Sequence, residues 1–225
     1  MIHSGVHEEI ICELYPFMAC YREFKPKNEA RKKQHEDNKY FFKRGQDNLM
    51  YCIYCIVKNT LDIRDFTKGA TNQALRTIAI ENCKADNGSK LKLIKQSKKD
   101  FMNDVFTIEK IDWIHFYGMC VYHDIVIYVI KKNLLYIYGE YDDDDPKVDG
   151  IIIIDNNSTF FEFADKKRAV NRDEYYIISN PTKPLKSASF YKIADLQEIC
   201  KKLNIDFLGL KKPVIYESIV NYMNE

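Results

Sequence analysis

The sequence predicts an α+β fold, in which a helical N-terminal half packs on an antiparallel β-sheet and a two-helix module follows at the C-terminus. Apolar residues recur at helical spacing through residue 124, whereas strand-like runs with short polar turns dominate the part that follows. A stretch containing prolines and serines, NPTKPLKSAS, then precedes a last pair of amphipathic segments. We therefore divide the chain into a body (residues 1–180), a linker (181–190) and a C-terminal module (191–225).

The N-terminal half contains the predicted helices. Residues 7–24 carry an apolar helical stripe, and the highly charged residues 25–44 predict an exposed loop or a ragged helix. Residues 47–59 open with an Asp-Asn helix-start signal and are apolar almost all round, which predicts a buried central helix. Two more helices are predicted at residues 71–85 and 89–106.

The middle of the chain supplies the predicted sheet. A further helix at residues 107–124 leads into runs of β-branched and aromatic residues that are separated by polar turns. Residues 125–130 and 134–138 form one predicted hairpin, residues 150–155 and 158–165 form a second, and residues 174–179 form a fifth strand.

Composition excludes several classes of protein. The net charge of +1, from 34 basic and 33 acidic residues, creates no general field for nucleic acids or membranes, so any electrostatic recognition must be local. The seven cysteines lack the spacing of a secreted scaffold and indicate reduced thiols in a cytosol-like compartment. No apolar run is long enough to cross a bilayer, and no cofactor-binding motif is present. We expect a soluble protein with no membrane insertion and no cofactor.

The C-terminal module has the most specific pattern. Two helical stripes flank a short loop, and the residues from Leu196 to Val214 read L-x-x-I-C-x-x-L-x-I-x-x-x-G-x-K-x-x-V. This pattern resembles the SAP family, a helix–extended loop–helix module. Gly209 and Lys211 stand at the positions of the loop glycine and loop lysine of that family.

The SAP resemblance implies a binding function. Members of the family often bind DNA, and they place the loop lysine and the start of the second helix against phosphates. The residues that the resemblance implies for DNA or partner binding are Lys201, Lys202, Gly209, Lys211 and Lys212. Phe207, an apolar residue that we expect to be exposed in the same loop, is a further candidate for binding a protein partner. Acidic residues in the same module reduce its positive charge, so two other interpretations stay open. The module could bind a protein, or it could be a helical cap on the sheet with merely solvated lysines.

A wider resemblance covers roughly the second half of the chain. The segments YGMCVYHD, IVIYVIKKNLLYIYG and KPLKSASFYKIADLQEICKKLNI resemble uncharacterised proteins of nucleocytoplasmic large DNA viruses, in which an α+β body precedes a SAP-like module. This resemblance implies a non-enzymatic binding or structural protein of the virion or replication site, located in the host cytoplasm or viral factory. Its partners would be DNA or other viral proteins. The alternative is a DNA-binding accessory factor of viral replication or transcription.

A third resemblance concerns catalysis. The segment DNLMYC, residues 47–52, resembles the helix start at which ovarian-tumour-type cysteine proteases place an aspartate and their nucleophile. It implies a papain-like body with Asp47 and Cys52 as candidates, and with His123 or His115 as the proton acceptor. The later strand that should carry the histidine has none. We therefore expect a catalytically empty body, and a cysteine protease acting on ubiquitin-like conjugates is the enzymatic alternative.

The same cysteines also suggest a metal site. Cys52-x-x-Cys55 and Cys120-x-x-His123 together form a ligand set that zinc accepts. Zinc knuckles place such pairs in turns, whereas the first pair here lies in an apolar predicted helix, where free cysteine behaves as a small hydrophobe. The expectation is that Cys52, Cys55 and Cys120 are buried without a common centre, and that no zinc is bound.

Overall fold

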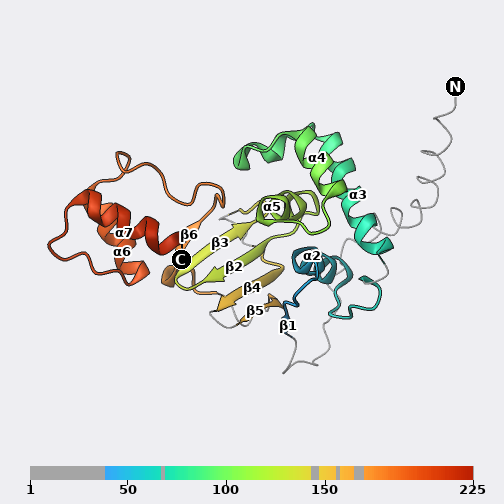
Figure 1. Cartoon of the computed structure of the whole chain (residues 1–225), viewed down its shortest axis with the longest axis horizontal. Coiled ribbons are helices and arrows are strands. Elements are labelled where there is room, and N and C mark those ends of the chain that lie inside the picture. Colours follow the sequence, from blue (N-terminus) through green and yellow to red (C-terminus); the bar gives the residue numbers. More distant parts are fainter. Residues whose placement is uncertain (1–38, 67–68, 143–146, 156–157, 165–169, 225) are drawn as a thin grey trace.

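The computed structural model describes residues 39–66, 69–142, 147–155, 158–164 and 170–224, and all structural statements below concern these residues. Helices pack on one face of a six-stranded mixed sheet, and two C-terminal helices lie beside the sheet (Figure 1). The predicted α+β class is therefore confirmed. The predicted helix at residues 7–24 and most of the charged stretch at 25–44 lie outside the described residues. No described helix is long and apolar enough to cross a membrane.

The helices of the body follow the predicted periodicity, with shifted ends. Asp47 caps the first one by accepting a hydrogen bond from the Met50 amide, as the Asp-Asn signal predicts. The body helices are α2 (Asn48–Lys58), α3 (Ala70–Ala85), the 3₁₀ helix η2 (Ser89–Ile94), α4 (Lys98–Thr107) and α5 (Trp113–Tyr122).

Two predicted helices have different boundaries in the structure, and side-chain caps set these boundaries. The helix predicted at residues 89–106 is divided, because Lys95 adopts a left-handed conformation and Ser97 accepts the Asp100 amide to start α4. The helix predicted at 107–124 begins only at Trp113. Its first turn is capped by Asp112, whose carboxylate accepts from the Ile114 and His115 amides.

The sheet contains both predicted hairpins and one strand that was not predicted. Its strand order is β1-β5-β4-β2-β3-β6. The strands are β1 (Tyr40–Phe41), β2 (Ile127–Lys131), β3 (Leu134–Tyr138), β4 (Gly150–Asp155), β5 (Ser158–Phe163) and β6 (Tyr176–Ile178). β1 lies within the stretch predicted as a loop or ragged helix, and it pairs with β5. A two-residue strand is too short to show an alternating pattern, which is why the sequence does not reveal it.

The prediction that the sheet is antiparallel is wrong. Each hairpin is antiparallel, but β2 pairs with β4 in parallel and β3 pairs with β6 in parallel. Asp149 holds the start of β4 beside the start of β2: its amide donates to the Val126 carbonyl (2.8 Å), and its carboxylate accepts from the Val126 amide (2.9 Å). The chain after β3 thus returns to the beginning of β2 before β4 starts, and this return makes the pairing parallel.

The body has an apolar core on each face of the sheet. The larger core lies between the sheet and helices α2 to α5, and it includes Ile127, Ile152 and Phe161 from the strands. The smaller core, around Tyr128 and Leu135, lies on the opposite face. Strand residues alternate between these cores with a period of two, which explains why the strands are apolar almost throughout.

Replacing Gly118 with alanine should destabilise the body by roughly 1–3 kcal/mol, because the added methyl group overpacks a filled core. A Cβ at Gly118 in α5 would lie 2.3 Å from the Cε2 atom of Phe101 in α4, which is fully buried. This clash should outweigh the roughly 1 kcal/mol by which alanine favours a helix over glycine. Urea unfolding followed by circular dichroism measures the change. An alanine variant as stable as the wild type would contradict this packing.

The predicted C-terminal helix–loop–helix is confirmed, and it has a core of its own beside the sheet edge. Helices α6 (Ile193–Leu203) and α7 (Lys212–Asn224) bury a third apolar cluster that includes Leu134 of β3 and Ile178 of β6. Figure 1 shows both helices beyond β3 and β6, apart from the helices of the body. Leu185, inside the predicted linker, also packs against this cluster.

Candidate functional site

Helices α6 and α7 begin at the same end of the C-terminal module. The hydroxyl of Tyr216, in the second turn of α7, donates to the carbonyl of Lys186 (2.9 Å), which precedes α6. The Lys186 amide donates to the hydroxyl of Tyr191 (3.1 Å), two residues before α6 starts. These two bonds hold the entrance of α6 beside the first half of α7. We call residues 186–193 and 210–214 the helix-start end.

Both helices also finish at a common place, the turn between β2 and β3. The side-chain amide of Asn133 donates to the carbonyl of Lys202, in the last turn of α6 (2.9 Å). The ammonium group of Lys132 lies 5.0 Å from the ring centroid of Tyr222, in the last turn of α7. The helices therefore run in the same direction, and the loop between them must return along the length of α6, about 16 Å for 11 residues.

This direction separates the lysines that the sequence proposes for binding. Lys211 and Lys212 lie at the helix-start end, whereas Lys201 and Lys202 lie at the opposite end, beside the β2–β3 turn. The helix-start end gains Lys186 and Lys192, both exposed, which the sequence pattern does not indicate. Lys186 falls in the predicted linker and Lys192 just before α6, so no periodicity relates either residue to Lys211.

The loop residues differ in their accessibility. Gly209 has a φ of +72°, the left-handed conformation that glycine adopts without strain. A Cβ at this position would meet no heavy atom within 4 Å. Leu208 is 82% exposed. The expectation that Phe207 is exposed is wrong, because its ring is half-buried against the core of the module. Phe207 therefore stabilises the loop, and Leu208 is the apolar side chain that faces solvent.

The two helix starts differ in charge. Asp195 lies in the first turn of α6, where its carboxylate accepts from the Lys192 amide (2.7 Å) and supplies a negative charge. The first turn of α7 contains no acidic residue, and Lys211 and Lys212 stand at its beginning. The positive end of a helix dipole together with nearby cations favours an anion. The electrostatics of the module thus favour an anion at the start of α7.

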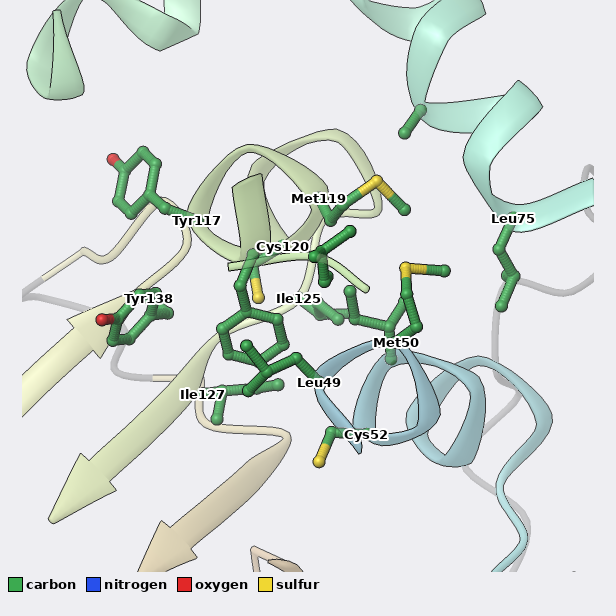
Figure 2. Close-up of a cluster of buried hydrophobic side chains, with 14 of the residues drawn as sticks. Leu49, Met50, Cys52, Leu75, Tyr117, Met119, Cys120, Ile125, Ile127 and Tyr138 are labelled. Carbon is green, nitrogen blue, oxygen red and sulfur yellow. The ribbon is translucent and has the colours of Figure 1, made fainter. Parts of the chain in front are cut away.

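The candidate cysteines lie inside the core of the body. Figure 2 shows Cys52 on α2 and Cys120 on α5 among apolar side chains that include Leu49 and Ile127. Cys52, Cys55 and Cys120 have no exposed surface, which confirms the expected burial. Burial raises the pKa of the Cys52 and Cys120 thiols well above their usual range. A buried thiol of raised pKa is a poor nucleophile.

Both candidate histidines are held by hydrogen bonds from their ring nitrogens to oxygen atoms. The Nε2 atom of His123 bonds to the carbonyl of Leu75 (3.0 Å). His115 lies between two carboxylates, with Nδ1 2.7 Å from Asp112 and Nε2 3.3 Å from Asp104. Among the described residues, no group of three or more His, Cys, Asp and Glu side chains is arranged to hold a metal ion.

Asp47 belongs to a buried ion pair. Its carboxylate lies 2.7 Å from the guanidinium of Arg76, and both side chains are at most 7% exposed. Burial raises the pKa of Asp47. The hydrogen bonds from the Met50 and Ile111 amides and the charge of Arg76 act in the opposite direction. The guanidinium also donates to the side chain of Asn72 and to the carbonyls of Val105, Ile108 and Glu109. Asp47 and Arg76 therefore join α2 and α3 to the segment before α5.

The sequence contains a signal for this ion pair, although Arg76 is not among the candidate residues predicted from it. Arg76 shares one face of α3 with Ala79, Ile80 and Cys83, at spacings of three, four and seven residues. A single arginine in a buried helical stripe needs an acceptor of opposite charge. A cavity of about 290 Å³ adjoins the pair, lined in part by Ile63 and Phe66. Because Asp47 and Arg76 bond to each other and to the backbone, they offer this cavity no uncommitted charge.

No protein-family model matches the sequence, and no curated protein and no solved structure is significantly similar to it. Function must therefore be inferred from the residues and their arrangement.

Proposed function

We propose that this protein is a non-enzymatic DNA-binding protein that holds DNA phosphates at the helix-start end of its C-terminal module. One observation carries the proposal. Two segments that are separate in the sequence bring four lysines to the end at which α6 and α7 begin. These lysines are Lys186, Lys192, Lys211 and Lys212.

The chemistry of this end suits a phosphate backbone. Lysine contacts release counterions from DNA, so a local cluster binds DNA even when the net charge of the chain is only +1. The start of α7 adds the positive end of a helix dipole and no opposing acid. Contacts of this kind position DNA but do not read its sequence. The proposal therefore implies binding that depends strongly on salt and weakly on sequence.

The body then acts as a scaffold. Its sheet supports the module through Leu134 and Ile178, and the thiol of Cys52 has no access to solvent. In the large DNA viruses whose proteins the second half resembles, such a protein would serve in the virion or at the replication site.

Replacing Lys211 and Lys212 together by alanine should weaken DNA binding for all sequences alike. It should also reduce the slope of log affinity against log salt by roughly one unit per lost phosphate contact. The matched control is the double variant Lys201→Ala and Lys202→Ala, which removes the same charge at the opposite end of the module and should bind nearly as the wild type does. Fluorescence anisotropy with a labelled oligonucleotide at several salt concentrations measures both variants.

Equal losses in the two double variants would show a diffuse charge effect and contradict the proposed location. If neither variant changes DNA binding, the proposal is wrong. Leu208, exposed at the loop corner, then becomes the first position to test for a protein partner.

A further inference from the structure

We infer that the DNA held at the helix-start end is single-stranded, an inference that rests on the proposed function. The module exposes an unusual amount of apolar surface near its lysines. More than half of the large exposed apolar side chains in the described part of the chain lie in this module or at the residue just before it: Phe190, Ile193, Leu208, Leu210 and Val214.

Apolar and basic residues alternate along both segments that form this end. In the sequence, Phe190 and Ile193 flank Lys192. Leu210 and Val214 flank Lys211 and Lys212. Because α6 and α7 begin together, the two segments bring their apolar and basic side chains to the same end. A partner that fits this surface must itself combine negative charge with apolar faces at short intervals.

Phe190 is the residue best placed to contact a base. Its side chain is 60% exposed, and the ammonium group of Lys186 lies 3.8 Å from the ring centroid. The turn that carries it is held by the Phe190 amide, which donates to the Ser187 carbonyl (2.9 Å). The bonds from Tyr216 and to Tyr191 fix Lys186 on either side. A ring held in place this way loses little freedom when a base stacks on it.

The physical contrast with duplex DNA favours a single strand. In a duplex, the bases stack on one another and the phosphates face the protein, so an exposed phenylalanine finds no apolar surface beside a phosphate contact. In a single strand, each base has a π face that an aromatic side chain can cover while lysines contact the neighbouring phosphates. Stacking of this kind tolerates any base, which agrees with the absence of sequence reading in the proposed function.

The test compares a labelled oligothymidylate with a duplex of equal length, using the full-length protein and fluorescence anisotropy. Wild type should bind the single strand more tightly than the duplex. Replacing Phe190 with alanine should weaken binding to the single strand about tenfold, the effect of one lost base stack, and should change duplex binding by less than about twofold. Replacing Phe190 with tyrosine, which keeps an aromatic ring, should preserve binding to the single strand.

The matched control is Phe106→Ala, because Phe106 on α4 is 59% exposed but belongs to the helical layer of the body. It should bind both ligands as the wild type does, and circular dichroism checks that each variant is folded. A duplex bound as tightly as the single strand would overturn the inference, as would equal behaviour of the Phe190→Ala and Phe106→Ala variants. If the Lys211 and Lys212 double variant still loses affinity in that case, the proposed function stands and only the choice of strand is wrong. If the wild type binds neither ligand, both proposals fail.

Discussion

Replacing Arg76 with methionine should lower the free energy of unfolding by about 3–5 kcal/mol, the usual cost of removing one partner from a buried ion pair. Methionine fills much of the same volume but donates no hydrogen bond. The carboxylate of Asp47 would stay buried without its counter-charge, and the carbonyls of Val105 and Ile108 would lose their donor. Urea unfolding at neutral pH, followed by circular dichroism, measures the change.

The matched control is Arg64→Met, because the chain has an exposed arginine–aspartate pair as well as the buried one. Arg64 is 85% exposed and pairs with Asp62, so its loss should leave the unfolding midpoint unchanged. The double variant Arg76→Met with Asp47→Asn should be destabilised by less than the sum of the two single changes, since each change removes the partner of the other. An Arg76 variant as stable as the Arg64 variant would show that the buried pair is not formed.

Acidification from pH 7 to pH 4 should destabilise the protein by about 3 kcal/mol through His123 alone, at 1.36 kcal/mol per pKa unit. Burial lowers the pKa of His123 to about 4, from an ordinary value of 6.5. Above pH 6.5 the ring is neutral in both the folded and the unfolded state, and its contribution to stability is complete. As the pH falls below 6.5, only the unfolded state takes up the proton, so stability decreases until the folded state is protonated near pH 4.

The variant His123→Gln isolates this effect because glutamine keeps an amide donor for the Leu75 carbonyl but does not titrate in this range. Unfolding free energies of both proteins are measured in urea at several pH values. The difference between wild type and variant should be constant above pH 7 and should shift in favour of the variant by about 3 kcal/mol between pH 6.5 and pH 4. Parallel stability curves for the two proteins would mean that His123 is accessible to protons in the folded state.

Local patterns in the sequence determined most of the elements of this fold. The cap at Asp47, the buried run after it and the two hairpins depend on neighbouring residues, and all of them are confirmed. The left-handed backbone at Gly209 follows from the same local logic, since a loop corner favours the residue without a Cβ. In the candidate binding site, Lys211 could be proposed from the sequence because the loop pattern marks its position.

Only the tertiary structure decided how these pieces meet. Strand alternation is the same for parallel and antiparallel neighbours, so the sequence cannot show that Asp149 starts β4 beside the start of β2. Likewise, Lys186 and Lys211 share an end of the module because the hydroxyl of Tyr216 reaches the Lys186 carbonyl, thirty residues away along the chain. The sequence by itself determined most of the helices and strands and the cap at Asp47, whose energies arise within a few residues. The strand directions, the Asp47–Arg76 pair and the grouping of the lysines arise between distant residues, and these contacts exist only once the chain has folded.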